Sequence, residues 1–173
     1  MKTKNLIERL SLFLLALVLT MPTWAQGGSG NESETITIAS KEDWKTFCQR
    51  VNDNGEPFLN AKLTQDVDLG TDIAMVGTAK KPYAGTFDGQ NHVLTLNWNA
   101  GSVNDVAPFR RVGGATIRNL RTEGSIQSDG YFLGGLIDEA YGGSNTVANC
   151  VSAVNITSSY TSYRCGAAGL VNY

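Results

Sequence analysis

The stretch TIRNLRTEGSI, residues 116–126, returns thirty residues later as TVANCVSAVNI, residues 146–156. Both copies alternate apolar and polar side chains around an asparagine in the same place. The matched pairs are Ile117 and Val147, Asn119 and Asn149, Leu120 and Cys150, and Ile126 and Ile156. A repeat at a fixed period predicts that the copies are equivalent strands in successive units of a repeat architecture.

A second element follows each copy. LGGLID at 133–138 matches AAGLVN at 167–172 with an offset of 34 residues, so the loop between the elements differs in length. APFRRVGG at 107–114 looks like a degenerate earlier copy, with Phe109 in the place of Leu136 and Leu170. Constant strand cores with variable loops are typical of a solenoid whose coils stack and whose loops protrude.

Stacking follows from the physics of a single coil. One coil offers a few short strands with one apolar face each, and only a neighbouring coil can bury that face. We therefore expect a structural ladder in which Leu120 stacks on Cys150. Asn119 and Asn149 should stack at a corner, with their amides hydrogen-bonded along the stack. Parallel strands joined in this way are expected to coil with a right hand.

The region before the repeats has a different texture. TITIA at 35–39 alternates and predicts a short strand. Ser40 is a good N-cap, and Trp44, Phe47, Cys48 and Val51 form one apolar helical stripe that ends at Asn54-Gly55. We expect residues 35–84 to form an N-terminal cap with a helix, followed by the first strands.

The segment GTFDGQNHVLTL, residues 85–96, contains Asp88 and the chain's one histidine, His92. An Asp near a His suggests a catalytic pair, but no G-x-S-x-G elbow presents a nucleophile. The structural interpretation, which we favour, is that Asp88-Gly89 makes a turn with Asp88 bonded to nearby backbone, and that His92 begins an outward-facing strand.

These motifs, in this order, resemble the GLUG-motif repeat family of exported bacterial surface proteins. The resemblance includes the lead-in LTQDVDLG and MVGTAKKPYAGTFDG and covers about residues 35–173. It departs at Asp138 and Asn172, which replace the second glycine of the tetrad, and at APF, which replaces GLF. The resemblance implies a mainly β fold, a right-handed parallel β-helix over 85–173 with an N-terminal strand and capping helix. It also implies an adhesion-like role, and it transfers no catalytic residue.

Residues 1–25 have a basic start, a short apolar run and the small residues Thr23 and Ala25 before a cleavage position. This pattern predicts a secretory signal peptide removed near Ala25; the alternative is an uncleaved membrane anchor. Residues 26–34, QGGSGNESE, predict a flexible tether. We expect a secreted or cell-surface protein with no membrane span in the mature chain.

Charge argues against nucleic acid as a partner. The whole chain carries −2 and the signal +2, so the mature part carries −4, whereas phosphate binding needs clustered basic residues. The basic pairs Lys80-Lys81 and Arg110-Arg111 are interpreted as solvated turn residues.

The cysteine and aspartate spacings give no metal motif. We expect Cys48 and Cys150 to be buried as small apolar residues, and a Cys150–Cys165 disulfide stays open. Asp66, Asp68 and Asp72 could bind calcium from one strand face, but they lack the EF-hand glycine and glutamate, so a solvated face is favoured. No cofactor is expected.

Four tyrosines lie in the Gly/Ser-rich loops between the repeated cores: Tyr131, Tyr141, Tyr160 and Tyr163. They are candidates for binding a host protein or a glycan, because tyrosine is an amphipathic contact residue. The alternative is that they pack back onto the solenoid.

The function expected from the sequence is non-enzymatic: an exported protein that displays loops for adhesion or for host or glycan binding. A polysaccharide-active enzyme or carbohydrate-binding module is the alternative, although Asp129, Asp138, Glu139 and Glu123 are scattered over coil loops without a repeated pair. A third possibility is a structural spacer in a longer protein. Because the chain stops inside a repeat at Tyr173, further repeats or another chain are expected to cover its C-terminal edge.

Overall fold

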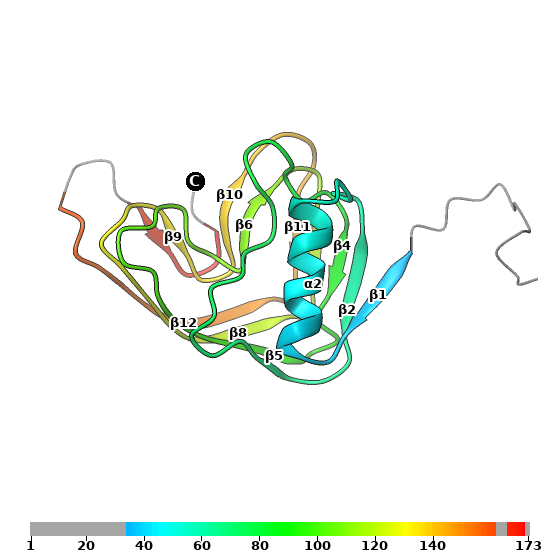
Figure 1. The fold of residues 1–173 in the computed structure, drawn as a ribbon, viewed down its shortest axis with the longest axis horizontal. Helices are drawn as coiled ribbons and strands as arrows, with labels where there is room; N and C mark the ends of the chain where they lie inside the picture. Colours follow the sequence, from blue (N-terminus) through cyan, green and yellow to red (C-terminus); the bar gives the residue numbers. More distant parts are fainter. Residues whose placement is uncertain (1–33, 162–165, 172–173) are drawn as a thin grey trace, which may run out of the picture. The chain divides into compact units, whose positions relative to one another are not determined.

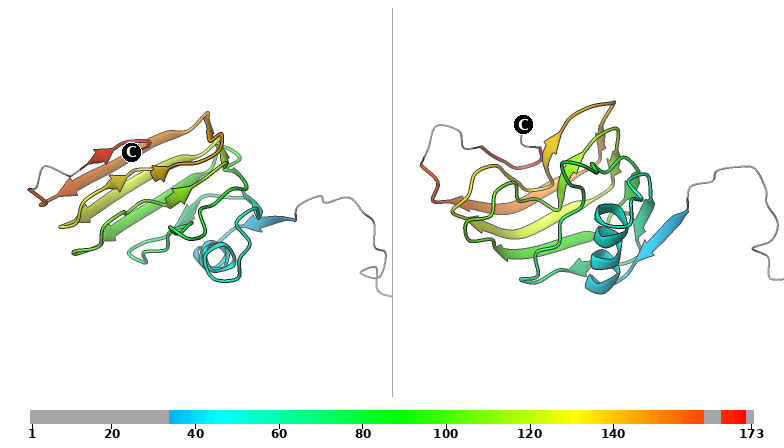
Figure 2. Two further views of the ribbon diagram at one scale, coloured as in Figure 1. Left: turned by 90° about the horizontal axis from the view of Figure 1, so that it is seen from above. Right: turned by 45° about the horizontal axis from the view of Figure 1, so that its top comes forward.

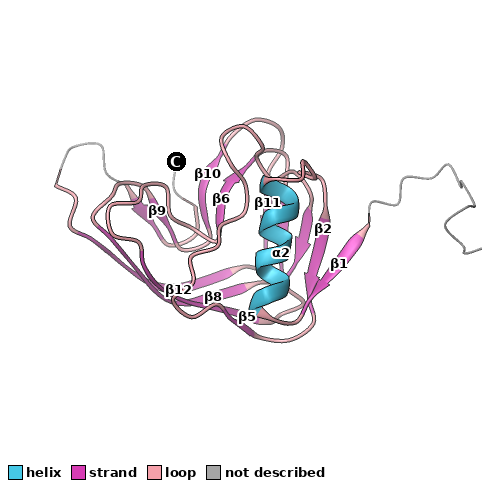
Figure 3. Cartoon of the chain, viewed as in Figure 1, coloured by secondary structure: helices cyan, strands magenta, loops and turns pink. Residues whose placement is uncertain are grey.

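The computed structural model describes residues 34–161 and 166–171. Parallel strands dominate it, with one helix near the N-terminal end (Figure 1, Figure 3). In chain order the elements are β1 (Thr35–Ile38), α2 (Lys41–Asn52), β2 (Asn60–Leu63), β3 (Val67–Asp68), β4 (Thr86–Asp88), β5 (Val93–Asn99), β6 (Phe109–Val112), β7 (Thr116–Arg118), β8 (Arg121–Ser128), β9 (Leu133–Gly134), β10 (Ile137–Ala140), β11 (Thr146–Ala148), β12 (Val151–Ser158) and β13 (Ala167–Ala168).

The strands form a β-solenoid of about 4 turns, which confirms the predicted parallel β-helix class. One sheet has the order β1-β2-β4-β7-β11 and a second the order β12-β8-β5-β3, while β10-β6 and β13-β9 form two shorter sheets. We call the turns coil one (60–83), coil two (86–112), coil three (116–140) and coil four (146–171). Figure 2 shows them following one another in chain order away from the helix.

The predicted register of the repeats is confirmed. Ile117 pairs with Val147 and Ile126 with Ile156, which is the 30-residue offset, and Ala167 pairs with Leu133 at the offset of 34. The match of Phe109 with Leu136 and Leu170 is wrong by one residue, because Phe109 pairs with Ile137, which bridges to Val171. The corner before Ile137 has one residue more than the corner before Phe109, so the two copies are not collinear there.

The helix closes the first coils as predicted. The Ser40 hydroxyl accepts a hydrogen bond from the Asp43 amide at 3.1 Å, and the Asp43 carboxylate accepts one from the Ala39 amide at 3.0 Å. These two bonds satisfy backbone donors at the helix start. The face that α2 turns to the core is Trp44, Phe47, Cys48 and Val51, all buried.

Aromatic rings join the helix to the first two coils. The Trp44 ring lies 5.7 Å from both Phe87 and Phe109 in edge-to-face geometry, and Phe47 lies 5.4 Å from Tyr83. The Trp44 indole N–H donates to the Ala74 carbonyl at 2.9 Å, so this buried polar group has a partner. Each such ring pair adds about 0.5–1.5 kcal/mol beyond the area it buries.

The fourth coil leaves ladder positions open. Val147, Leu170 and Val171 are 38–41% exposed, although their counterparts in coil three include the buried Ile117 and Ile137. Cys150, expected to be buried, is only half-buried, because Leu120 covers it from one side while coil four ends the described stack. Cys48 is buried as expected, and burial raises the pKa of its thiol to about 12.

Some expectations fall outside the described residues. The predicted signal peptide and nearly all of the tether lie within 1–33, and Tyr163 and Cys165 lie within 162–165. Over the part of the chain that the structure describes, no helix has the length and apolar character needed to cross a membrane.

Candidate functional site

A cavity of about 560 Å³ opens on the outside of coils two and three. Its walls come from the turn before β6, from β6 itself, from the loop before β9, and from β10 and the residue after it. The lining residues are Asp105, Arg111, Tyr131, Phe132, Asp138, Glu139 and Tyr141. We call this the coil cavity. It combines aromatic rings with fixed charges, which is the usual composition of a ligand pocket.

Two glycines make the corner that leads into the cavity wall formed by β10. A Cβ on Gly134 would overlap the carbonyl oxygen of Ile137, three residues further on. A Cβ on Gly135 would overlap the carbonyl oxygen of Gly169 in coil four. Glycine is therefore required at both positions of coil three, where the pair forms a bend that brings β10 beside β9.

Arg111 reaches the cavity because β6 carries a bulge. The amides of Arg110 and Arg111 both donate to the carbonyl of Val76, at 2.8 and 3.3 Å, so two residues of β6 oppose one of coil one. A bulge of this kind re-aims side chains. As a result Arg111 lines the coil cavity, while Arg110 lines a separate groove beside α2.

The Arg111 guanidinium joins carboxylates from two coils. Its Nη2 donates to Asp105 Oδ2 at 2.9 Å, and its Nη1 donates to Glu139 Oε2, the cross-strand neighbour of Arg111 in coil three. The Arg111 and Asp105 side chains are each only 17% exposed. This partial burial makes the network more rigid than a solvated ion pair. The interpretation of Arg110-Arg111 as solvated turn residues is wrong, since both lie in β6 and both approach Asp105.

Asp138 adds a third carboxylate, from a position that is only 2% exposed. The sequence predicted that Asp138 and Glu139 are scattered over coil loops. In the structure they line one cavity together with Asp105. Their sequence separation hid this arrangement: Asp105 is brought close by the stacking of coils, with its amide bonded to the Tyr131 carbonyl at 3.0 Å.

The candidate tyrosines behave differently from one another. Tyr131 lines the coil cavity and also packs against Phe132 at 5.1 Å and against Tyr160 at 5.4 Å. Tyr141 lines the cavity, is 39% exposed and donates its hydroxyl to the Ala79 carbonyl at 3.1 Å. Tyr160 thus packs back onto Tyr131, as the alternative interpretation expects, while Tyr131 and Tyr141 line the cavity. Ligand binding by these residues stays a prediction.

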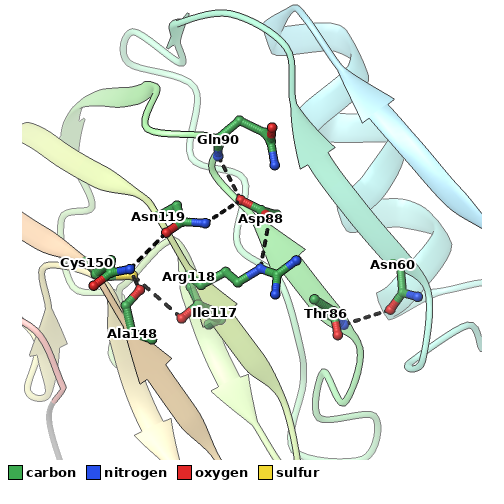
Figure 4. Close-up of polar contacts among 10 residues, drawn as sticks. Asn60, Thr86, Asp88, Gln90, Ile117, Arg118, Asn119, Ala148 and Cys150 are labelled. Carbon is green, nitrogen blue, oxygen red and sulfur yellow. Dashed lines mark hydrogen bonds and ion pairs between the residues drawn. The ribbon is translucent and has the colours of Figure 1, made fainter.

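Asp88 is the centre of a structural network at the opposite corner of the coil (Figure 4). Its Oδ1 accepts from the Gln90 amide at 2.9 Å and from Asn119 Nδ2 at 3.0 Å, and its Oδ2 accepts from Arg118 Nε at 2.8 Å. Asn149 Nδ2 donates to Asn119 Oδ1 at 3.2 Å, so the side-chain ladder continues into coil four. His92 pairs with Asp66 at 3.1 Å rather than with Asp88.

The three aspartates considered for calcium serve separate purposes. Asp66 accepts from the Val93 amide, Asp68 from the Gly70 amide, and Asp72 pairs with Lys41 and Lys45. Across residues 34–161 and 166–171, no group of three or more His, Cys, Asp and Glu side chains could hold a metal ion.

The fold and the coil cavity define a parallel β-solenoid with an aromatic and charged pocket on its outer surface. Comparison with protein-family models, with curated proteins and with solved structures finds no match.

Proposed function

We propose that the protein is an exported, non-enzymatic β-solenoid that binds a carbohydrate in the coil cavity. The observation that supports this proposal is the cavity of about 560 Å³ in which Tyr131, Phe132 and Tyr141 face an Arg111-centred ion-pair network. Aromatic rings pack against the C–H faces of sugar rings, and fixed carboxylates and guanidinium groups bond sugar hydroxyls.

Export is proposed from residues 1–25, which have the charge, length and small-residue pattern of a secretory signal. An extracellular location suits a glycan or host-surface ligand. The resemblance to the GLUG-motif repeat family supports the same role.

Binding without turnover is favoured by the way the carboxylates are held. Asp105 and Glu139 both accept from Arg111, an arrangement that suits fixed acceptors for sugar hydroxyls. Glycoside hydrolysis needs one carboxyl group that gives up a proton while a second acts as nucleophile or base. Asp138, buried beside these two, is the observation that favours the second candidate, a polysaccharide-active enzyme.

The test is binding of a glycan array by the purified protein, followed by calorimetric titration of the positive glycans. Tyr141→Ala is expected to weaken binding about tenfold or more, the usual effect of removing an exposed aromatic contact. Tyr141→Phe keeps the ring and should retain most of the affinity. Phe58→Ala, which removes a 70% exposed ring outside the coil cavity, is the matched control and should bind as the parent protein does.

Release of reducing sugar from a bound glycan, abolished by Asp138→Asn, would replace the binding proposal with the enzyme. Failure to bind any glycan, with the fold intact by circular dichroism, would contradict both.

A further inference from the structure

We propose that a second groove, separate from the coil cavity, docks a peptide segment of a partner protein that carries a large apolar side chain next to acidic residues. The groove has a volume of about 390 Å³ and lies where the corner before β2 meets the turn before β4. We call it the Phe58 groove, and its walls include Pro57, Phe58, Lys80, Lys81, Pro82 and Ala84. The proposal does not depend on carbohydrate binding, since the groove shares no lining residue with the coil cavity.

The groove exposes an aromatic ring to solvent. Phe58 is 70% exposed, more than any other large apolar residue that the structure describes. Leaving such a side chain in water forgoes about 1.5–3 kcal/mol of burial. Pro57, Pro82 and Ala84 add apolar surface to the same groove. Apolar surface with a polar rim is typical of protein–protein contact sites, in which aromatic residues are enriched.

Backbone hydrogen bonds hold the two walls of the groove in place. The Ala84 amide donates to the Pro57 carbonyl at 2.8 Å, which joins the corner to the turn. Thr78 and Lys81 exchange backbone hydrogen bonds at 3.0 and 3.1 Å, and these bonds close the turn that carries Lys80. Because the backbone of the groove is already fixed, binding a partner costs little further ordering of the protein.

The charge of the lining favours an acidic partner. Lys80 and Lys81 are its charged residues, and no acidic residue lines the groove. Neither ammonium group forms an ion pair with a carboxylate of the described chain; Glu56, next to the corner, pairs with Arg50. Lys81 Nζ donates to the Asp53 carbonyl at 2.7 Å, but it keeps its charge and two further N–H groups. A carboxylate here would gain Coulomb attraction and charge-assisted hydrogen bonds.

A peptide fits this lining better than an anionic sugar or a membrane does. Apart from the lysines, the side chains of the Phe58 groove offer no hydrogen-bond partner, so sugar hydroxyls buried there would lose their bonds to water. An anionic membrane would repel the chain as a whole, whose formal charge is −2. A peptide supplies an apolar side chain for the ring and the prolines and carboxylates for the lysines.

The test is a selection of short random peptides displayed on phage, with the purified protein as bait and Phe58→Ala for counter-selection. The selected peptides should combine a large apolar residue with neighbouring Asp or Glu residues. Synthetic copies, measured by fluorescence polarisation, should bind Phe58→Ala at least about tenfold more weakly than the parent protein. Their binding should also weaken as salt is raised from 50 to about 500 mM, because screening reduces the charge attraction.

Three further variants report on charge and on exposure. Lys80→Glu reverses one charge at an exposed turn, so it should weaken binding of the selected peptides while the urea-unfolding midpoint stays unchanged. Lys62→Glu is the matched charge control, because Lys62 is an exposed lysine of β2 outside the groove. Val103→Ala, which removes a 42% exposed apolar side chain elsewhere, is the control for exposure. Both controls should bind the peptides as the parent protein does.

The outcomes decide between the possible occupants. A selection that yields no peptide, or peptides that bind Phe58→Ala as tightly as the parent protein, would overturn the docking site. Selected peptides without an excess of acidic residues would overturn the acidic partner. Tighter binding of phosphatidylglycerol vesicles or of hexagalacturonate, lost in Phe58→Ala, would overturn the peptide in favour of a membrane or an anionic sugar. None of these results bears on glycan binding in the coil cavity, so the two proposals fail independently.

Discussion

One interior ladder position has opposite surroundings at the two ends of the solenoid. Along the sheet formed by β2, β4, β7 and β11, this position is occupied by Ala61, Phe87, Ile117 and Val147. The first three are at most 1% exposed, whereas Val147 is 38% exposed. All four side chains are apolar, so residue type does not explain the difference.

The difference comes from what lies on each side of the coil. At the helix end, Trp44 and Phe47 of α2 pack against Phe87 and close the interior. At coil four, no described element packs on the outer side of β11 and β12. In a solenoid a side chain is therefore buried by the coils on either side of it. An end coil is stabilised only where another element packs against it.

The largest expected effect is at the covered end. Phe87→Ala removes a fully buried ring that contacts Trp44, Phe47 and Phe109. Large-to-small changes of this kind in a packed core cost about 3–5 kcal/mol. Urea unfolding followed by tryptophan fluorescence should show a loss in this range. A loss below about 1 kcal/mol would mean that the helix does not close the interior as described.

The next effect concerns the asparagine ladder, in which Asn119 is bonded on both sides and Asn149 on one. Asn119→Gly should lower the free energy of unfolding by about 1–3 kcal/mol, because Asp88 loses a partner in a part-buried site. Asn149→Gly should lower the free energy of unfolding by clearly less, because Asn149 makes only the bond to Asn119 in this ladder.

Asn119→Ala provides a second measurement at the same position. Asn119 has φ of 53°, a left-handed conformation that asparagine and glycine tolerate and alanine does not. The alanine variant should therefore be less stable than Asn119→Gly by about 1 kcal/mol. If Asn119→Gly and Asn149→Gly were equally stable, the stability contributed by an asparagine would not depend on its position in the ladder.

A smaller effect should appear as a pH dependence at Asp88. Burial alone would raise the pKa of this carboxyl, but bonds from Asn119, the Gln90 amide and Arg118 outweigh it and hold the pKa below its usual value. The stabilisation is complete above the unfolded-state pKa of about 3.9 and is lost as the pH falls through the lower folded-state pKa.

Asp88→Asn removes this titration. The stability advantage of the parent protein over Asp88→Asn, measured by urea unfolding, should be constant near neutral pH and shrink below about pH 4. An advantage that persists unchanged at pH 2 would contradict an ionised Asp88 in the ladder.

The smallest effect is expected at the open end. Val147→Ala occupies the same ladder position as Phe87→Ala but removes a side chain that is already 38% exposed. The loss should stay below about 1 kcal/mol by the same unfolding measurement. A cost as large as that of a buried core residue would mean that Val147 is covered in the protein in solution.

Much of the fold could be predicted from the sequence because coils repeat. The offset of 30 between 116–126 and 146–156 fixed the pairing of two coils, and the stripe from Trp44 to Val51 fixed the helix. The pairing of Phe109 could not be predicted, because the corner Gly134-Gly135-Leu136 has one residue more than Ala107-Pro108. An extra residue in a corner shifts the pairing of the strand that follows by one residue, and no local sequence pattern shows this shift.

The candidate site could be predicted only in part. Tyr131 and Tyr141 were recognised as loop aromatics, and both line the coil cavity. Asp105 and Arg111 were missed because one lies in a turn and the other is re-aimed by a bulge, which leaves no periodic signal. The cross-strand pairing of Arg111 with Glu139 could have been suspected from opposite charges at equivalent positions, but only with the correct register in hand.

The sequence by itself determined the class of fold, the order of the coils, the capping helix and the asparagine ladder, because these depend on alternation and repetition along the chain. Only the tertiary structure decided where the cavity lies, which charges meet in it and which ladder residues are buried. These depend on contacts between residues about thirty positions apart, and one residue more or less in a corner changes which side chains meet. Burial of the ladder residues and the charge pairs that join neighbouring coils, such as Arg111 with Glu139, are properties of the stack, and a single coil does not contain them.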